Sequence, residues 1–163
     1  MILSVMMNPK RLVTAYIEWL MERPTYAITL TFNWLGGIAT ASAEEKIREF
    51  GAFIDRARLG SRFYKKPVEA RTKFILVPEK FSGGYPHYHG VIQCPTEDGT
   101  SIAVSDHATL FEEAWRAVVP SGTVRLEPVH DAEGWGRYIT KETGMNFERT
   151  VHSYDQWSSR SGQ

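Results

Sequence analysis

Two histidines separated by a single residue are the side chains of this sequence best suited to hold a metal ion. His87 and His89 fall in a predicted strand, so both imidazoles should project from the same face. Glu79 ends the preceding predicted strand, across a glycine-rich turn, where its carboxylate could supply an oxygen ligand. Two nitrogens and one carboxylate leave coordination positions open for a phosphate and water, as a Lewis-acid site requires. Such a mixed set would accept Mg²⁺ or Mn²⁺, and imidazole suits Mn²⁺ somewhat better.

The same spacing has interpretations that need no metal. Two histidines around one residue are common by chance. A pair of exposed strand histidines, or histidines packed beneath an N-terminal helix, would give the same pattern. A cupin-type site would place a glutamate shortly after the second histidine, whereas residues 90–93 are Gly-Val-Ile-Gln. The sequence also lacks the strands of a double-sheet barrel, so the cupin interpretation is disfavoured.

A tyrosine and a lysine three residues apart are the second candidates for chemistry. Tyr138 and Lys141 lie in a predicted helix and therefore on neighbouring positions of one helix face. A phenol is a poor nucleophile at neutral pH because its pKa is about 10. A metal on a scissile phosphate and a nearby ammonium would both favour the phenolate. A phosphotyrosyl bond keeps the energy of the cleaved linkage, so a free 3′-hydroxyl could reverse the step.

Packing is the alternative role of this helix. The rings of Trp135 and Tyr138 could simply cover the edge of a sheet. Gly134 and Gly136, however, are poor choices near the start of a helix built only for packing. These glycines would instead allow a DNA backbone to come close.

Hydrophobic periodicity predicts the elements that must position these residues. Residues 26–32 alternate Ile28 and Leu30 with Thr29 and Thr31, which predicts a strand with two distinct faces. Further strands are predicted at 73–77, 87–94 and 123–129, and helices at 42–59, 106–119 and 133–143. The order β-α-β-β-α-β-α predicts an α+β fold. We expect a ferredoxin-like or RRM-like sandwich with a central, mainly antiparallel sheet of about four to five strands and flanking helices on one face.

The composition is that of one globular domain. Of the 163 residues, 42% are hydrophobic and 23% are charged. We divide the chain into an N-terminal amphipathic helix (1–24), a catalytic domain (25–145) and a C-terminal tail (146–163) that is expected to be flexible. The single cysteine, Cys94, cannot form an internal disulfide, so a cytoplasmic location is expected. No apolar run approaches the ~18 residues that span a bilayer, so no membrane partner is expected.

Charge is balanced overall but uneven along the sequence. With 19 basic and 19 acidic residues the net charge is zero, which weighs against nonspecific coating of duplex DNA. One segment is strongly basic and contains a single acid, Glu69. Its cations are Arg56, Arg58, Arg62, Lys65, Lys66, Arg71 and Lys73. This segment could contact nucleic-acid phosphates, or it could equally be a solvated helix end and loop.

Three segments together resemble the HUH endonucleases, and among them the rolling-circle replication initiators (Rep proteins) of small plasmids, single-stranded DNA viruses and phages. The first motif of that family resembles the strand Ile28–Asn33. The second, His-hydrophobic-His, is similar to Pro86–Val91, and the third, Tyr-x-x-Lys, is similar to Tyr138–Lys141. Order and approximate spacing fit over about residues 26–142. The departure is Tyr88, because the middle residue of the second motif is usually aliphatic.

The resemblance implies metal-dependent cleavage of a DNA strand. Tyr138 would attack a phosphodiester at a replication origin, leaving a 5′-phosphotyrosyl adduct and a 3′-hydroxyl for a polymerase. His87, His89 and Glu79 would hold Mn²⁺ or Mg²⁺, and Lys141 would help to place the tyrosine. No second tyrosine lies four residues from Tyr138, as in the members with a single catalytic tyrosine.

The partners implied by the resemblance are single-stranded DNA, folded as an origin hairpin, and other proteins that supply helicase and polymerase. Many relatives carry a helicase domain, but this sequence has no G-x-x-x-x-G-K-[ST] motif. It would therefore borrow a helicase or be an isolated catalytic domain. Given that chemistry, DNA contacts are predicted from Asn33, Trp34, Arg62, Lys65, Lys66 and Lys73. Trp34 could stack on an unpaired base.

Two alternative functions remain open. A relaxase or a single-strand transposase shares the chemistry, although Tyr-x-x-Lys favours a Rep protein. A non-catalytic module that binds single-stranded nucleic acid would instead display aromatic side chains on the central strands of a ferredoxin-like fold. Phe32 and Phe74 are the candidates for such a platform.

Overall fold

The computed structural model describes residues 11, 14–15, 18–19, 26–33, 40–79, 87–95, 104–146 and 150–153. In chain order its elements are β1 (Tyr26–Thr31), α2 (Thr40–Leu59), the short 3₁₀ helices η1 (Phe63–Lys65) and η2 (Val68–Ala70), β2 (Lys73–Pro78), β3 (His87–Gln93), α3 (Val104–Val118), β4 (Thr123–Pro128), α4 (Ala132–Asn146) and β5 (Val151–His152). From β1 to α4 the strands and α-helices follow the order that the sequence predicts.

The strands form one antiparallel sheet in the order β4-β1-β3-β2-β5. β1 and β2 run parallel to each other with β3 between them, and β3 and β4 run parallel with β1 between them. Helices α2 and α3 make the crossover connections within these two pairs, which is the split β-α-β arrangement of ferredoxin-like folds. The predicted α+β sandwich with a mainly antiparallel sheet is confirmed.

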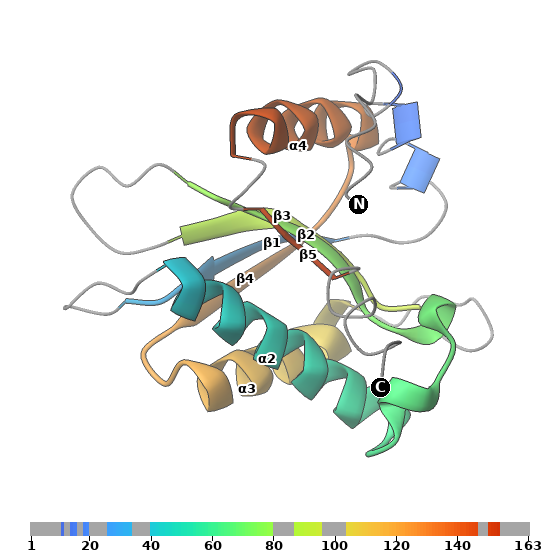
Figure 1. The fold of residues 1–163 in the computed structure, drawn as a ribbon, viewed down its shortest axis with the longest axis vertical. Coiled ribbons are helices and arrows are strands. Elements are labelled where there is room, and N and C mark those ends of the chain that lie inside the picture. Colours follow the sequence, from blue (N-terminus) through green and yellow to red (C-terminus); the bar gives the residue numbers. More distant parts are fainter. Residues whose placement is uncertain are drawn as a thin grey trace, which may run out of the picture.

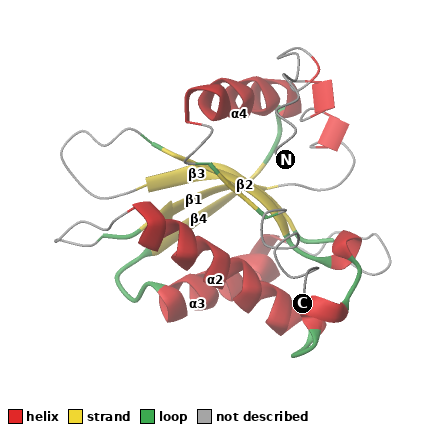
Figure 2. Ribbon diagram, in the orientation of Figure 1, coloured by secondary structure: helices red, strands yellow, loops and turns green. Residues whose placement is uncertain are grey.

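The helices lie on both faces of the sheet. Figures 1 and 2 show α2 and α3 together beneath one face and α4 on the opposite face. The expectation that all helices would share one face is therefore right for α2 and α3 and wrong for α4. The physical reason is a second apolar cluster, in which Ile139 of α4 packs against Ile75 of β2 and Val91 of β3. β2 is apolar on both faces, so both faces need a cover.

Aromatic rings fill the layer between the sheet and helices α2 and α3. The ring of Trp115 lies edge-on to Phe32 and Phe50, with centroids 5.0 and 5.5 Å apart. Its Nε1 donates a hydrogen bond of 2.9 Å to the carbonyl of Thr31, so the buried indole is satisfied. Edge-to-face pairs contribute about 0.5–1.5 kcal/mol each beyond their buried area. These contacts fix β1 against both helices and leave its other face for the site.

The C-terminal residues add an edge strand that the sequence analysis did not predict. β5 pairs with the middle of β2, and Val151 is fully buried. The Oγ of Ser153 accepts a hydrogen bond from the N–H of Phe74, and the N–H of Ser153 donates to the carbonyl of Phe74, each at 3.0 Å. The tail predicted at 146–163 therefore contains a strand of the sheet, and residues 154–163 lie outside the described residues.

Part of the N-terminal segment contacts the sheet. Its described residues 11, 14–15 and 18–19 are helical. Trp19 packs against the apolar cluster beneath α4, and its carbonyl accepts a hydrogen bond of 2.9 Å from Gln93 Nε2. The predicted N-terminal helix is therefore attached to the end of β3 through Trp19. Among the helices that the structure describes, none combines the length and the apolar character needed to cross a membrane.

Candidate metal centre and tyrosine helix

Strand alternation decides which side chains share the face that carries α4. His89 of β3 is paired with Thr29 of β1 and with Val77 of β2. Paired residues of a sheet project from the same face, so His89 lies between these two side chains. His87 comes two residues earlier on β3 and projects from that face as well. The two imidazoles therefore lie on one face of the sheet, near the start of β3.

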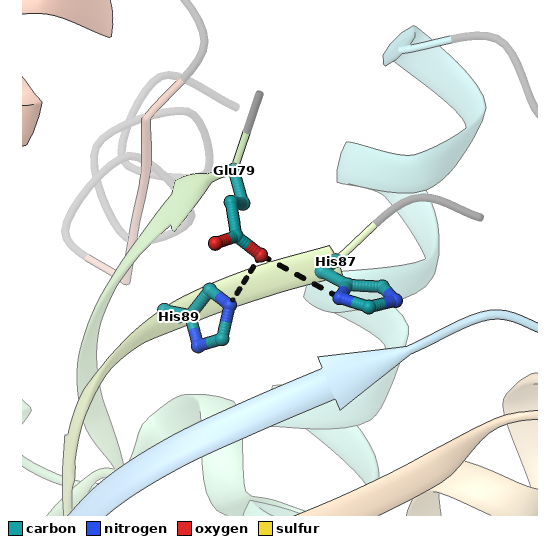
Figure 3. Close-up of side chains that lie close together, drawn as sticks. All are labelled: Glu79, His87 and His89. Atoms are coloured by element: carbon teal, nitrogen blue, oxygen red, sulfur yellow. Dashed lines mark hydrogen bonds and ion pairs between the residues drawn. The ribbon is translucent and has the colours of Figure 1, made fainter. Parts of the chain in front are cut away.

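The carboxylate of Glu79 lies between the two imidazoles (Figure 3). Glu79 Oε2 is 3.0 Å from His89 Nε2 and 3.6 Å from His87 Nδ1. A backbone hydrogen bond of 3.0 Å, from the N–H of Glu79 to the carbonyl of His87, holds the end of β2 against the start of β3. One ligand atom from each residue lies within 4.8 Å of the others. Glu79, His87 and His89 are called the ligand triad below.

The ligand triad is suited to a divalent cation. The hydrogen bond with His89 is the main cause that holds the pKa of Glu79 below its ordinary value, so the carboxylate is ionised at neutral pH. The side chains are 56% exposed for Glu79, 39% for His87 and 25% for His89, so an ion and a phosphate can reach them. Ligand atoms bound to one ion at about 2.1 Å lie at most about 4 Å apart. Small side-chain movements are enough for the triad to fit Mg²⁺ or Mn²⁺.

His89 has a second partner that the sequence analysis did not assign. Its Nδ1 lies 3.0 Å from the Oγ1 of Thr29, a residue 60 positions earlier in the chain. The sequence placed Thr29 on the face of its strand opposite Ile28 and Leu30, and this was the available signal. The strand register that brings it to a histidine cannot be read from that local pattern.

The residue between the histidines points away from the site. Tyr88 is 2% exposed, and its ring centroid lies 6.2 Å from that of Phe32 in the core. Its bulk therefore fills the layer beneath the sheet, and the departure from the usual aliphatic residue leaves the face with the ligand triad unchanged.

Gly90 allows β3 to approach β2 directly after the second histidine. A Cβ at this position would lie 1.8 Å from the backbone oxygen of Ile75, far inside van der Waals contact. Any side chain here would push the two strands apart. Because His89 and Glu79 come from those strands, Gly90 helps to set the distance between them.

Helix α4 is anchored on the same face as the ligand triad. Ile139 is fully buried and packs against Ile75 and Val91. Val91 lies two residues after His89 on β3 and therefore projects from the same face. The helix that carries the candidate nucleophile is thus fixed to the strand that carries the histidines.

The candidate nucleophile is partly accessible. Tyr138, next to the buried Ile139, is 39% exposed, and its ring lies edge-on to Trp135 with centroids 5.4 Å apart. Lys141 is exposed in the following turn of the helix. An ion pair of 2.6 Å between Arg137 and Glu133 lies on the solvent side of α4. Tyr138 therefore combines one packed edge with an accessible surface, which a nucleophile for a large substrate requires.

Asp131 caps the N-terminus of α4 and explains one of its glycines. Asp131 Oδ1 accepts a hydrogen bond of 2.8 Å from the N–H of Gly134, as an N-cap residue does. A Cβ on Gly134 would lie 2.1 Å from Asp131 Oδ2. Gly134 thus makes room for the capping carboxylate, and Gly136 is buried. The expectation that these glycines admit a DNA backbone loses its support.

Asn33 is the predicted DNA-contacting residue that lies at the end of the first motif strand. Its backbone is left-handed with φ 49°, a conformation that asparagine tolerates better than most residues. Its Nδ2 donates a hydrogen bond of 3.1 Å to the carbonyl of Ser121, before β4. The side chain is exposed but holds this turn. Trp34 lies outside the described residues.

The predicted basic DNA contacts lie at the other end of β2 from Glu79. Lys73 begins β2 and Glu79 follows it, so the strand separates them by roughly 20 Å. Arg62, Lys65 and Lys66 are exposed around η1, before β2 begins. The structure does not bring these cations to the ligand triad, and their contact with DNA stays a prediction.

Another cation of the basic segment has a structural role. Arg58 is buried, lies 3.6 Å from Asp55 and donates a hydrogen bond of 3.0 Å to Thr72 Oγ1. It also donates to the carbonyl of Pro95. Arg58 therefore ties the end of α2 to the loops around β2 and β3.

The aromatic platform of the non-catalytic alternative is not formed by its two candidates. Phe32 and Phe74 are 0% and 1% exposed, and both belong to the core beneath α2 and α3. Neither ring can stack on a base in this fold.

The comparison with known families agrees with this fold and site. Residues 25–144, which are most of the chain, match the family of the replication-associated protein ORF2. The chain belongs to this family of replication-associated proteins. Searches of curated proteins and of solved structures give no significant match.

Proposed function

We propose that this protein nicks and rejoins single-stranded DNA in a metal-dependent reaction with a 5′-phosphotyrosyl intermediate. The observation that carries the proposal is the ligand triad, with Glu79 Oε2 3.0 and 3.6 Å from the two histidine nitrogens. It lies on the face to which the helix of Tyr138 is anchored. Membership of a replication-associated family supports a role at a replication origin. Such a nick would start rolling-circle replication of a plasmid or phage.

The roles of the residues follow from their chemistry. His87, His89 and Glu79 hold Mn²⁺ or Mg²⁺, which when bound withdraws charge from an oxygen of the scissile phosphate. The phenol oxygen of Tyr138 attacks the phosphorus, and the bond from phosphorus to the 3′-oxygen breaks. The phenol loses its proton and the departing 3′-oxygen gains one, so no further reactant is consumed. The 3′-hydroxyl can attack the phosphotyrosyl bond in reverse, which rejoins the strand.

Lys141 assists this step from the next turn of α4. It lies three residues after Tyr138, on a neighbouring position of the same helix face. Its ammonium favours the phenolate and the negative charge that develops on the phosphate. The role is one of charge and placement, because the lysine does not form a bond in the reaction.

The substrate and partners follow from the same reaction. Tyr138 must reach one phosphodiester of an exposed strand, which an unpaired loop or a hairpin at an origin offers. The nick leaves a 3′-hydroxyl that another protein, a polymerase, extends. The chain has no G-x-x-x-x-G-K-[ST] motif, so another protein supplies the helicase.

A covalent adduct tests the nucleophile. The protein is mixed with 5′- or 3′-labelled single-stranded hairpin DNA and Mn²⁺, and SDS-resistant protein–DNA adducts are separated on a gel. We expect an adduct with the wild type and none with Tyr138→Phe. Tyr64→Phe is the matched control, because Tyr64 is also exposed but lies on η1. An undiminished adduct in Tyr138→Phe would remove the assignment of the nucleophile.

Metal removal tests the ligand triad in the same assay. EDTA or His87→Ala should abolish cleavage and leave DNA binding, measured by fluorescence anisotropy, largely intact. His130→Ala is the control, because His130 is an exposed histidine outside the ligand triad. Cleavage that survives both EDTA and His87→Ala would remove the metal from the proposed function.

A further inference from the structure

The second histidine of the ligand triad is held at both ring nitrogens. Its Nδ1 lies 3.0 Å from Thr29 Oγ1, and its Nε2 lies 3.0 Å from Glu79 Oε2. Thr29 comes from β1 and Glu79 follows β2, so His89 on β3 has one partner from each neighbouring strand. The ring orientation of His89 is therefore set by two groups and not by packing alone.

These two partners differ in the hydrogen bonds that they can make. An ionised carboxylate only accepts hydrogen bonds, whereas a threonine hydroxyl both donates and accepts. Without a cation, a neutral His89 donates from Nε2 to Glu79 and accepts at Nδ1 from Thr29. When Nε2 serves as a metal ligand, its lone pair must be free, so the ring proton lies on Nδ1. Thr29 can then accept that proton without changing its place.

We propose that Thr29 is a positioning residue of the metal centre: its hydroxyl accepts the Nδ1–H of His89 and keeps the Nε2 lone pair directed at the cation. The partner of the second nitrogen commonly fixes the tautomer and the orientation of a ligating histidine. This inference rests on the proposed function, because it requires that the ligand triad binds a divalent ion. It gives the first motif strand, β1, a defined part in the site.

Thr31 provides a matched control for Thr29. It lies on the same strand and the same face, opposite His87. Its Oγ1 is 2.5 Å from Thr123 Oγ1 and accepts a hydrogen bond of 3.2 Å from the N–H of Thr123. The hydroxyl of Thr31 thus joins β1 to β4, whereas that of Thr29 reaches a ligand of the triad.

Titration with Mn²⁺ alone, followed by calorimetry, tests the proposal on the folded protein. Thr29→Val replaces the hydroxyl by a methyl group of similar size, and we expect Mn²⁺ affinity to fall about 10- to 100-fold. Thr29→Ser restores the hydroxyl and should bind close to the wild type. Thr31→Val should also bind close to the wild type. Mn²⁺ affinity of Thr29→Val equal to that of the wild type overturns the proposal.

The tautomer of His89 gives a readout that a purely structural role would not change. Long-range ¹H–¹⁵N spectra are recorded at about pH 8, above the ordinary histidine pKa of ~6.5. Mg²⁺ serves as the diamagnetic probe. In the wild type and in Thr29→Ser, the ring proton of His89 should lie on Nε2 without Mg²⁺ and on Nδ1 with it. A proton that stays on Nε2 with saturating Mg²⁺ overturns the proposal, even where Thr29→Val fails to fold.

The outcomes separate this inference from the proposed function. Normal Mn²⁺ binding by Thr29→Val, or the wrong tautomer in the wild type, removes the role of Thr29 and leaves the ligand triad standing. Absence of Mn²⁺ binding by the wild type removes the role of Thr29 together with the metal of the proposed function.

Discussion

Glu79 supplies the only acidic side chain of the ligand triad, and its charge distinguishes a metal centre from three hydrogen-bonded side chains. Glu79→Gln keeps the shape of the side chain and removes the charge. We expect Mn²⁺ affinity, measured by calorimetry, to fall at least about tenfold, the lower end of the effect for outer-shell partners. The melting temperature should change little, because the side chain is 56% exposed.

Glu127→Gln is the matched control for this change. Glu127 is an exposed carboxylate on β4 that pairs with Arg125 at 2.6 Å, outside the ligand triad. Its loss should leave Mn²⁺ affinity unaltered. If Glu79→Gln bound Mn²⁺ as the wild type does, the ion would be held by the two histidines with a different third ligand.

Cys94 should be inert in the folded protein. Burial raises the pKa of its thiol from 9.0 to about 12. Only the thiolate reacts, so an aromatic disulfide reagent at about pH 8 should label Cys94 slowly in the native state and fast in guanidinium. The raised pKa also means that the contribution of the thiol to stability is complete below pH 9 and is lost as the pH rises toward 12.

Comparison with Cys94→Ala isolates this pH dependence. The wild type should lose stability more steeply than Cys94→Ala above pH 9, measured by urea unfolding at several pH values. Parallel pH profiles for the two proteins, or fast labelling of the native thiol, would contradict the buried and protonated state of Cys94.

The site residues differ in how far sequence could predict them. Alternation along one strand is local, so it predicted that His87 and His89 share a face, and the hairpin predicted that Glu79 lies near them. Thr29 could not be assigned, because its contact with His89 depends on strand register over 60 positions. The roles of Tyr138 and the ligand triad in DNA cleavage remain proposals.

At the scale of elements, the start of α4 couples a cap to a glycine. Asp131→Ala removes the cap and should cost about 1 kcal/mol of unfolding free energy. Gly134→Ala should give none of the usual helix gain of about 1 kcal/mol. The reason is that its Cβ would lie 2.1 Å from Asp131 Oδ2 and displace the cap. In the double variant this conflict is gone, so the alanine at 134 should stabilise relative to Asp131→Ala alone.

A double-mutant cycle measured by urea unfolding checks this coupling. The effect of Gly134→Ala should be more favourable with alanine at 131 than with aspartate, by about 1 kcal/mol. Additive effects of the two changes would show that the cap and the glycine are independent.

Elements with a strong period were predictable, and those whose place depends on partners were not. The helices α2 and α3 and the strands β1 to β4 follow from apolar spacing along continuous segments. β5 has two residues, Val151 and His152, which is too short for any period to show. The side of the sheet that α4 covers depends on Ile75 and Val91, and the apolar runs of β2 and β3 do not reveal which face is already covered.

At the scale of the whole molecule, the sheet separates two apolar clusters of unequal size. The larger lies beneath α2 and α3, and the smaller, around Ile139, lies beneath α4. Helix α4 packs over β2 and β3, so the part of that face formed by β1 and β4 carries polar residues such as the exposed Arg125. Since Arg125, Thr29 and His89 lie in one row across the strands, this polar area adjoins the ligand triad. A DNA strand can therefore approach the triad from the β4 side without displacing α4.

The edge strand β5 closes the other side of the sheet, and two truncations measure its contribution. A chain ending after Ser153 keeps β5, and a chain ending after Arg149 loses it. The shorter chain exposes the site that buries Val151 and leaves the N–H of Phe74 without its partner Ser153 Oγ. We expect a loss of about 2–4 kcal/mol in unfolding free energy by urea titration. Below its melting temperature the shorter chain should bind Mn²⁺ normally, because β5 pairs with the middle of β2, on the edge away from β3. Equal stability of the two truncated chains would mean that β5 is not part of the fold in solution.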